Sequence, residues 1–269
     1  TLSTQTVRSG EFATAPAPTT TAYKVFNGWK VNGITVNAEE YRITADTVFV
    51  ADITYKFDVK FIANGATHDT QIVEKNGKPA VPENPTKQNY TFVGWSLNGT
   101  NTVSVADTVI TENTTFTAIF KINEYTVTFK DGNTVLSEQQ IQHGEYATAP
   151  ENPTKENHTF AGWSLNGTDT VSVADTAITE NTTFTAVFKI NEYTVTFKNG
   201  NTQLSAQQVE HGKIASVPEP PTKGGYTFVG WSVDGATVIA VESYIITKDT
   251  TFLAVFKQAG KPYSLGFDT

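Results

Sequence analysis

Short stretches in which aromatic or aliphatic residues alternate with threonine or charged residues recur along the chain. One of them reads Tyr125-Thr126-Val127-Thr128-Phe129, and it returns at residues 193–197 and, more loosely, at residues 57–61. Alternation with a period of two is typical of a β-strand that buries one face. Each stretch is therefore predicted to be the opening strand of a small β unit.

The residues after each opening strand predict the rest of the unit. The turn Asp131-Gly132-Asn133 leads into a partner strand at residues 134–142, since glycine allows the positive φ of a tight hairpin. A proline-punctuated loop follows, as at residues 150–155, where the missing N–H groups disfavour sheet pairing. Residues 173–178 are predicted to hold one short helical turn, and residues 183–188 alternate again as the closing strand.

A tetrad of aromatic residue, spacer, glycine and tryptophan occurs four times and contains every tryptophan of the chain. The tryptophans stand at positions 29, 95, 163 and 231, so they are 66, 68 and 68 residues apart. A large aromatic residue at a fixed place in each period is what a small domain uses to anchor its core. The predicted structural core anchors are Gly28, Trp29, Gly94, Trp95, Gly162, Trp163, Gly230 and Trp231.

This period predicts a division of the chain into tandem modules near the lower size limit for independent folding. The predicted boundaries are 1–53, 54–121, 122–189 and 190–257 for four repeats and 258–269 for a C-terminal tail. Residues 120–125 run from a closing strand directly into an opening strand without glycine, proline or serine, so they are not expected to form a flexible linker. The sequence thus predicts a mainly β fold of small modules that form an elongated, semi-rigid rod.

The first repeat is predicted to be incomplete. Residues 2–10 align with residues 136–144, so the opening strand of the first repeat has no counterpart in this sequence. A sheet that lacks one strand exposes unpaired backbone groups. We expect the missing strand to lie upstream in a longer parent, or its place to be filled by another chain or by the tail. The absence of methionine also indicates a processed product or an excised fragment.

The order of these features resembles the Listeria–Bacteroides repeat, the group that includes the B-repeat of bacterial internalins. The matching residues are the opening strand at 125–129, Pro153-Thr154-Lys155, Phe160-Ala161-Gly162-Trp163 and the closing strand at 183–188. The resemblance covers about residues 2–257. It implies compact β-grasp-like modules, similar to ubiquitin-like folds, strung together on surface and secreted proteins of bacteria. It implies no catalytic activity.

Composition narrows the classes of function. The chain has 269 residues, no cysteine and a net charge of −8. Without cysteine, disulfides, thiolate catalysis and thiolate metal sites are excluded. No repeat offers a basic stripe, so nucleic acid and anionic membrane are poor partners. No apolar run approaches the ~20 residues that a membrane-spanning helix needs, so no membrane insertion is expected within this chain.

The titratable residues offer few candidates for chemistry. His143 and His211 hold equivalent places before a glycine but belong to different repeats, so we interpret them as solvated turn residues rather than metal ligands. Asp107 and Asp175 are interpreted as turn-forming residues, because acid–base catalysis needs two carboxyl groups that face one cleft. No catalytic residue, cofactor or metal site is predicted, and the chain is not expected to be an enzyme.

The remaining candidate surface is aromatic. Tyr90, Tyr226 and Tyr244 would offer a binding surface for a protein or glycan if they are exposed, although packing at the core edge is the favoured role. We expect a non-catalytic stalk or spacer of a bacterial cell-surface or secreted protein, extracellular or anchored to the cell wall. Its partners would then be adjacent domains of the same polypeptide. The alternative is an adhesin-type module that binds a host surface protein or glycan.

Overall fold

The computed structural model describes residues 3–260, and most of the C-terminal tail assigned to 258–269 lies outside this range. The described chain contains sixteen β-strands and three 3-10 helices of three residues each. It divides after Asn123 into two compact units, each with two of the predicted repeats. The prediction of a mainly β fold built from tandem small modules is confirmed, and the β-grasp assignment stays a prediction.

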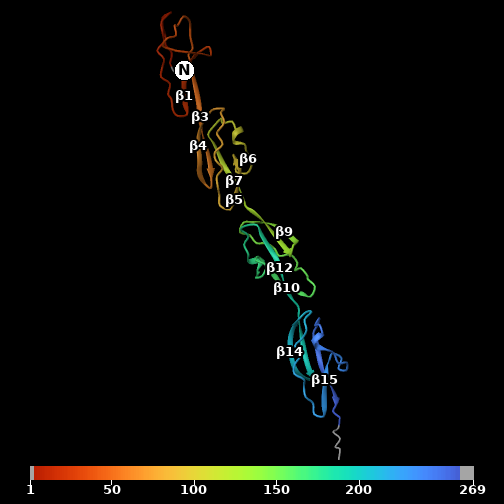
Figure 1. Cartoon of the computed structure of the whole chain (residues 1–269). Coiled ribbons are helices and arrows are strands. Elements are labelled where there is room, and N and C mark those ends of the chain that lie inside the picture. Colours follow the sequence, from red (N-terminus) through yellow and green to blue (C-terminus); the bar gives the residue numbers. More distant parts are fainter. Residues whose placement is uncertain (1–2, 261–269) are drawn as a thin grey trace, which may run out of the picture. The chain divides into compact units, whose positions relative to one another are not determined.

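One sheet runs through the first unit in the order β2-β1-β3-β7-β5-β6, with β4 paired to β3 (Figure 1). Its elements are β1 Lys24–Val31, β2 Ile34–Val36, β3 Val50–Ala63, β4 Ala66–Glu74, β5 Tyr90–Ser96, β6 Thr102–Val103, η1 Val105–Asp107 and β7 Thr114–Ile122. Strand β3 has 14 residues and pairs with β1 near its start and with β4 and β7 further along. The first two repeats therefore share one strand, where the sequence suggested a closing strand followed by a separate opening strand.

The second unit contains two sheets, in the orders β11-β10-β12-β8-β9 and β14-β13-β16-β15. The first is built from β8 Glu124–Asp131, β9 Thr134–Gln142, β10 His158–Ser164, β11 Thr170–Val171, η2 Val173–Asp175 and β12 Thr182–Ile190. The second is built from β13 Glu192–Asn199, β14 Thr202–Glu210, β15 Tyr226–Ser232, η3 Val241–Ser243 and β16 Thr250–Gln258. These bounds confirm the predicted strands, the hairpin turns and the short helical turn.

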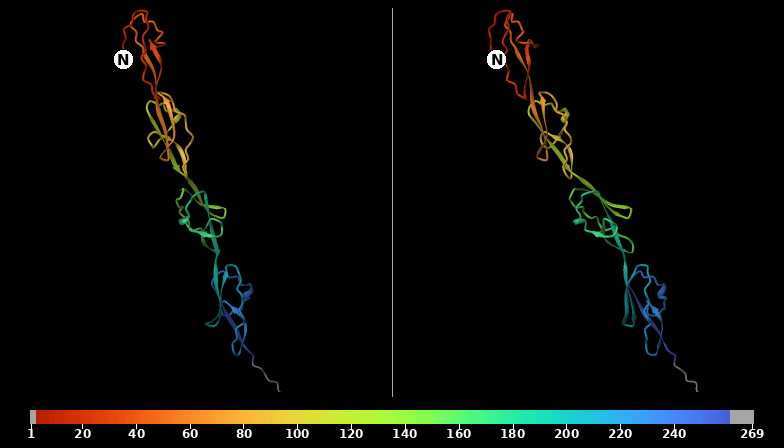
Figure 2. Two further views of the ribbon diagram at one scale, coloured as in Figure 1. Left: turned by 90° about the vertical axis from the view of Figure 1, so that its left-hand side faces the viewer. Right: turned by 60° about the vertical axis from the view of Figure 1, so that its left-hand side comes forward.

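The three complete repeats share one pairing pattern, and Figure 2 draws their strands from two further sides. In the third repeat, the opening strand β8 pairs antiparallel with β9 and parallel with the closing strand β12. Strand β12 then pairs antiparallel with the tryptophan strand β10. The opening strand therefore lies inside the sheet, with a neighbour on each side.

The core of each complete repeat lies between one face of its sheet and the loops that cross that face. In the third repeat, the strands contribute Phe129, Trp163 and Phe184, and the loops contribute Ala147 and Ile178. The Phe129 ring stacks on Phe184 at a centroid distance of 5.2 Å, and Trp163 meets Phe129 edge-on at 5.0 Å. The second and fourth repeats have the same three-ring arrangement.

Candidate functional site

Each glycine–tryptophan pair lies where the tryptophan strand bulges. In β10, Phe160 pairs with Phe188 and Gly162 pairs with Val187, so Ala161 is an extra residue in the ladder. Gly162 has φ of +148°, and a Cβ placed there would lie 2.9 Å from Cγ2 of Thr170. Glycine is therefore favoured at position 162 for two reasons: it tolerates the positive φ, and it leaves room for the Thr170 side chain.

The tryptophan side chains are buried in their own repeats. Their exposed fractions are 8% for Trp29, 3% for Trp95 and 4% for both Trp163 and Trp231. Each indole meets the first aromatic residue of its tetrad edge-on, at centroid distances of 5.3 to 5.5 Å. Each of the four therefore contributes to a packed interior and presents no open aromatic face to a ligand.

The structure does not gather the three candidate tyrosines into one site. Tyr244 is half-buried and packs edge-on against Phe252 at 5.4 Å. The Lys87 ammonium lies 3.7 Å from the ring centroid of Tyr90, and that of Lys223 lies 4.4 Å from the ring centroid of Tyr226. A lysine over the ring occupies the face on which a sugar would stack. Binding at these tyrosines stays a prediction, with Tyr226 (45% exposed) the most accessible of the three.

His143 and His211 lie in turns, as interpreted, but their rings are packed rather than fully solvated. Both are only partly exposed and have a buried Nδ1. Their rings lie 6.0 Å from Tyr125 and 5.9 Å from Tyr193. Sequence periodicity missed this packing because it reports neighbours along one strand, not across a hairpin. Within residues 3–260, no three His, Asp or Glu side chains come together as a metal ion would require.

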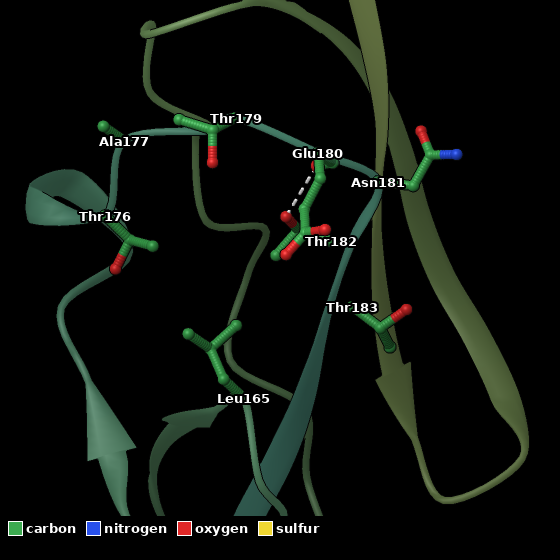
Figure 3. Close-up of a pocket in the computed structure, with 8 residues that line it drawn as sticks. All are labelled: Leu165, Thr176, Ala177, Thr179, Glu180, Asn181, Thr182 and Thr183. Atoms are coloured by element: carbon green, nitrogen blue, oxygen red, sulfur yellow. Dashed lines mark hydrogen bonds between the residues drawn. The ribbon is translucent and has the colours of Figure 1, made fainter.

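A shallow depression of about 370 Å³ lies in the third repeat between the loop after η2 and the start of β12 (Figure 3). It is lined by Leu165, Thr176, Ala177, Thr179, Glu180, Asn181, Thr182 and Thr183. Glu180 is the one titratable residue of this lining, and the Thr182 hydroxyl donates to its carbonyl oxygen at 2.9 Å. A single carboxylate does not provide the acid and base pair of a hydrolytic site.

The aspartates in turns are held by local hydrogen bonds. Asp107 accepts one from the Ser104 hydroxyl at 2.7 Å, which, with the nearby Lys78 ammonium, lowers the pKa of Asp107. Asp234 accepts a bond from Ser232 and two from backbone N–H groups, and these hold the pKa of its carboxyl well below the ordinary value. Both carboxylates therefore stabilise turns.

The described part of the chain contains no helix of the length and apolar character that crossing a membrane requires.

Comparison with known proteins places these features in a family. The model of the Listeria-Bacteroides repeat domain matches residues 57–119, 125–187 and 193–255, each beginning in an opening strand and ending in a closing strand. Two similar proteins of Evansella cellulosilytica are named "Putative membrane protein" (32% identity over 207 residues) and "Putative Gly-rich membrane protein" (34% over 194 residues). Internalin H of Listeria monocytogenes is 40% identical over 90 residues.

The aligned regions cover 74%, 66% and 32% of this chain but only 31%, 22% and 16% of these three relatives, so the chain spans less than a third of each. The family match, by contrast, takes in all three complete repeats, more than half of the chain. The chain belongs to the Listeria–Bacteroides repeat domain family.

Proposed function

We propose that this chain is a non-catalytic spacer of a bacterial surface protein, which holds other domains of the same polypeptide at a set separation. The mechanism is geometric, because firm junctions convert the number of repeats into reach. The observation that carries the proposal is the way in which consecutive repeats are joined.

The junction between the third and fourth repeats is a single residue bonded on both sides. Asn191 stands between β12 and β13; its N–H donates to the Asn157 carbonyl at 2.9 Å, and its Oδ1 accepts from the Thr159 hydroxyl at 2.8 Å. Its carbonyl accepts from the His211 N–H of the following repeat at 2.7 Å. Asn123 makes the equivalent bonds to the repeat that precedes it. Residues bonded in this way do not behave as a flexible tether.

The first junction has no separate linker. Strand β3 continues from the first repeat into the second, and the Lys56 N–H donates to the Tyr23 carbonyl at 2.9 Å. The Tyr23 hydroxyl also donates to the Asp58 carboxylate at 2.9 Å, and this contact raises the pKa of Tyr23. These bonds join the two repeats across their boundary and support the same mechanism.

The relatives support a location at the bacterial surface. Two are named as membrane proteins and one as an internalin, and the shared region is a minor part of each. We therefore assign the chain an extracellular or cell-wall-attached position, with adjacent domains as its partners.

Spin labels on either side of Asn191 test the rigid junction. The chain has no cysteine, so cysteines introduced at the exposed residues Glu151 and Glu219 would be the only labelling sites. The proposal predicts a narrow distribution of label-to-label distances by pulsed electron resonance. Four Gly-Ser residues inserted after Asn191 should broaden it. An equally broad distribution in the unmodified chain would contradict the spacer mechanism.

A further inference from the structure

We propose that each complete repeat is built to resist tension along the chain, and that the parallel pair of its opening and closing strands bears this tension in shear. The paired residues 127–130 and 182–185 of the third repeat are named the strand clamp. Its counterparts are residues 195–198 with 250–253 in the fourth repeat and residues 59–62 with 114–117 in the second. That tension reaches the repeats from other domains of the polypeptide rests on the proposed spacer function.

The chain enters and leaves a complete repeat through two neighbouring strands. In the third repeat it enters through β8, the first strand, and leaves through β12, the last. The sheet order β11-β10-β12-β8-β9 places these two strands side by side. Since the chain has no cysteine, no disulfide shares the load. Tension applied on both sides of the repeat therefore acts on the bonds between β8 and β12, whereas β9, β10 and β11 lie outside that path.

The parallel direction of β8 and β12 determines how this tension acts. Glu124, the first residue of β8, stands three positions before the strand clamp, and Ile190, the last residue of β12, stands five positions after it. At the usual rise of a strand, these points of entry and exit are about 36 Å apart along the strand direction. Pulling them apart slides the two strands past each other, so the bonds of the strand clamp carry the load together.

The antiparallel hairpin of the same repeat would respond differently. In the pair of β8 and β9, Glu124 is opposite Gln142, and the turn at residues 132–133 closes the far end. Tension between Glu124 and Gln142 would open this pair from one end and break its bonds one after another. Bonds that are loaded together need a larger force than bonds that are loaded in turn. Resistance therefore depends on the parallel pair being the one that joins entry to exit.

A side-chain hydrogen bond fastens the strand clamp at the end where the chain enters. Asn181 lies immediately before β12 (Figure 3), and its Oδ1 accepts the Thr126 N–H at 2.9 Å. The equivalent bonds of the second and fourth repeats join Asn113 to Asp58 at 3.0 Å and Asp249 to Thr194 at 2.8 Å. Because this bond also links the opening strand to the closing segment, it must break before the two strands can slide.

Stacked rings on the core face hold the register of the strand clamp. Phe129 is opposite Phe184, and their rings stack at a centroid distance of 5.2 Å and an interplanar angle of 14°. Trp163 meets Phe129 edge-on at 5.0 Å. Because successive residues of a strand point to opposite faces, a slip by one position would turn each phenylalanine away from the core. The strand clamp therefore either keeps its register or gives way as a whole.

The core face of each clamp is also sealed from water. The valine and the two phenylalanines on this face are 0% exposed in all three complete repeats: Val59, Phe61 and Phe116, then Val127, Phe129 and Phe184, then Val195, Phe197 and Phe252. Backbone hydrogen bonds that water can reach are readily exchanged for bonds to water. Burial therefore prevents water from replacing strained clamp bonds from this side.

Pulling one repeat in two directions tests the strand clamp. Because the chain has no cysteine, pairs of introduced cysteines define where the handles of an optical trap are attached. Glu124→Cys with Lys189→Cys loads the strand clamp in shear. Glu124→Cys with Glu180→Cys pulls on the two ends at which the strands begin, so it opens the strand clamp like a zipper. All three residues are exposed.

We expect the rupture force to be severalfold higher in shear than in the zipper direction. In shear, the third repeat should give way in a single step of about 190 Å, the extended length of the chain between Glu124 and Lys189 less their separation in the folded repeat. Equal rupture forces in the two directions would overturn the proposal, and so would rupture in shear by several small steps.

Two substitutions separate the strand clamp from the general stability of the repeat. Asn181→Ala removes the bond that fastens the strand clamp, whereas Gln139→Ala removes two bonds to the Thr148 backbone that lie outside the path of the load. Forced rupture is governed by the rate of unfolding rather than by equilibrium stability. Asn181→Ala should therefore lower the rupture force in shear, and Gln139→Ala should leave it unchanged even though it lowers the melting temperature.

Asn181→Asp is the conservative variant and should keep the force of the parent, because Asp249 makes the same bond in the fourth repeat. Equal losses of force in Asn181→Ala and Gln139→Ala would contradict the assignment of the load to the strand clamp. These measurements load one repeat and do not depend on the distances across Asn191. A broad distance distribution with a strong clamp would overturn the spacer function alone, and a narrow one with equal rupture forces would overturn the strand clamp alone.

Discussion

At the scale of single residues, the tryptophan of each tetrad is one of the large side chains that fill the core of its repeat. Trp163 is 4% exposed and meets Phe129 and Phe160 edge-on. Such aromatic pairs contribute beyond simple burial of apolar area. The core of a 68-residue module is small, so the loss of one such side chain is a large fraction of its stability.

Replacement of Trp163 by alanine should lower the free energy of unfolding of the third repeat by about 3–5 kcal/mol. Hydrogen exchange resolved by peptide can measure this, with loss of protection confined to β8–β12. Trp163→Phe, which keeps an aromatic ring, should cost much less. Near-native protection in Trp163→Ala would mean that the indole does not hold the core together.

The glycine before each tryptophan should be equally intolerant of a side chain. Gly230 has φ of +155°, and an added Cβ would clash with Val238. We expect Gly230→Ala to destabilise the fourth repeat by about 1–3 kcal/mol. Gly224 lies in the same repeat without a neighbour within 4 Å and without a positive φ, so Gly224→Ala is the control and should be nearly neutral. Equal melting of both variants would refute the steric argument.

The hydrogen bonds of the turn residue Asp234 predict how the stability of the fourth repeat depends on pH. Because its hydrogen bonds favour the carboxylate, its pKa is lowered on folding; the resulting stabilisation is complete above the ordinary value of 3.8 and is lost as pH falls through the lower folded value. In a carbon-detected NMR titration, the Asp234 carboxyl should remain ionised at pH 3.8. Asn98 and Asn166 make the same turn bonds, so Asp234→Asn should keep the turn and abolish the titration. A midpoint near 3.8 for Asp234 would count against these bonds.

At the scale of elements, the opening strand holds the closing strand through one side chain as well as through the ladder. Asn181 Oδ1 accepts the Thr126 N–H at 2.9 Å, just before β8 and β12 begin their parallel pairing. Parallel strand pairs are slightly less stable per residue than antiparallel pairs. The Asn181–Thr126 hydrogen bond therefore adds stability at the residues where the parallel pairing begins.

We expect Asn181→Ala to speed exchange of the Thr126 amide and to cost about 1 kcal/mol of repeat stability. Asn181→Asp should restore both, because Asp249 accepts the Thr194 N–H in the fourth repeat. The two variants can be compared by amide exchange in NMR. If Asn181→Ala exchanges no faster than the parent, the side-chain bond does not form in solution.

Much of this element structure could be predicted from sequence, because its signals are local. Alternation at 125–129 and the Asp131-Gly132-Asn133 turn depend only on neighbouring residues, and both are confirmed. The parallel pairing of β8 with β12 could not be predicted, since it joins segments some 55 residues apart. The continuous strand β3 was also missed. At the first junction, Tyr55 pairs with Lys24 of β1 and Lys56 pairs with Glu74 of β4, so the strand is continuous. This junction has two residues between Thr54 and Phe57, whereas the next has three between Lys121 and Tyr125, and there Asn123 separates β7 from β8.

The candidate sites were less predictable than the elements. Burial of the tryptophans follows from their size and period, but the ring contacts of His143 and the lysine over Tyr90 depend on cross-strand geometry that no repeat pattern encodes.

At the scale of the whole molecule, the proposed spacer function requires that the repeats add length. A nine-residue strand such as β12 extends about 30 Å, so four such modules in line would extend about 120 Å. One compact domain of 269 residues would instead have a radius of gyration of about 18 Å. The two arrangements differ enough for scattering in solution to separate them.

Small-angle X-ray scattering of the chain in dilute solution is the most direct measurement of this claim. Repeats held in line by firm junctions predict a radius of gyration of about 35 Å, from the length of a 120 Å rod built of strands at their usual rise. A value near 18 Å, that of a compact domain, would contradict the spacer account.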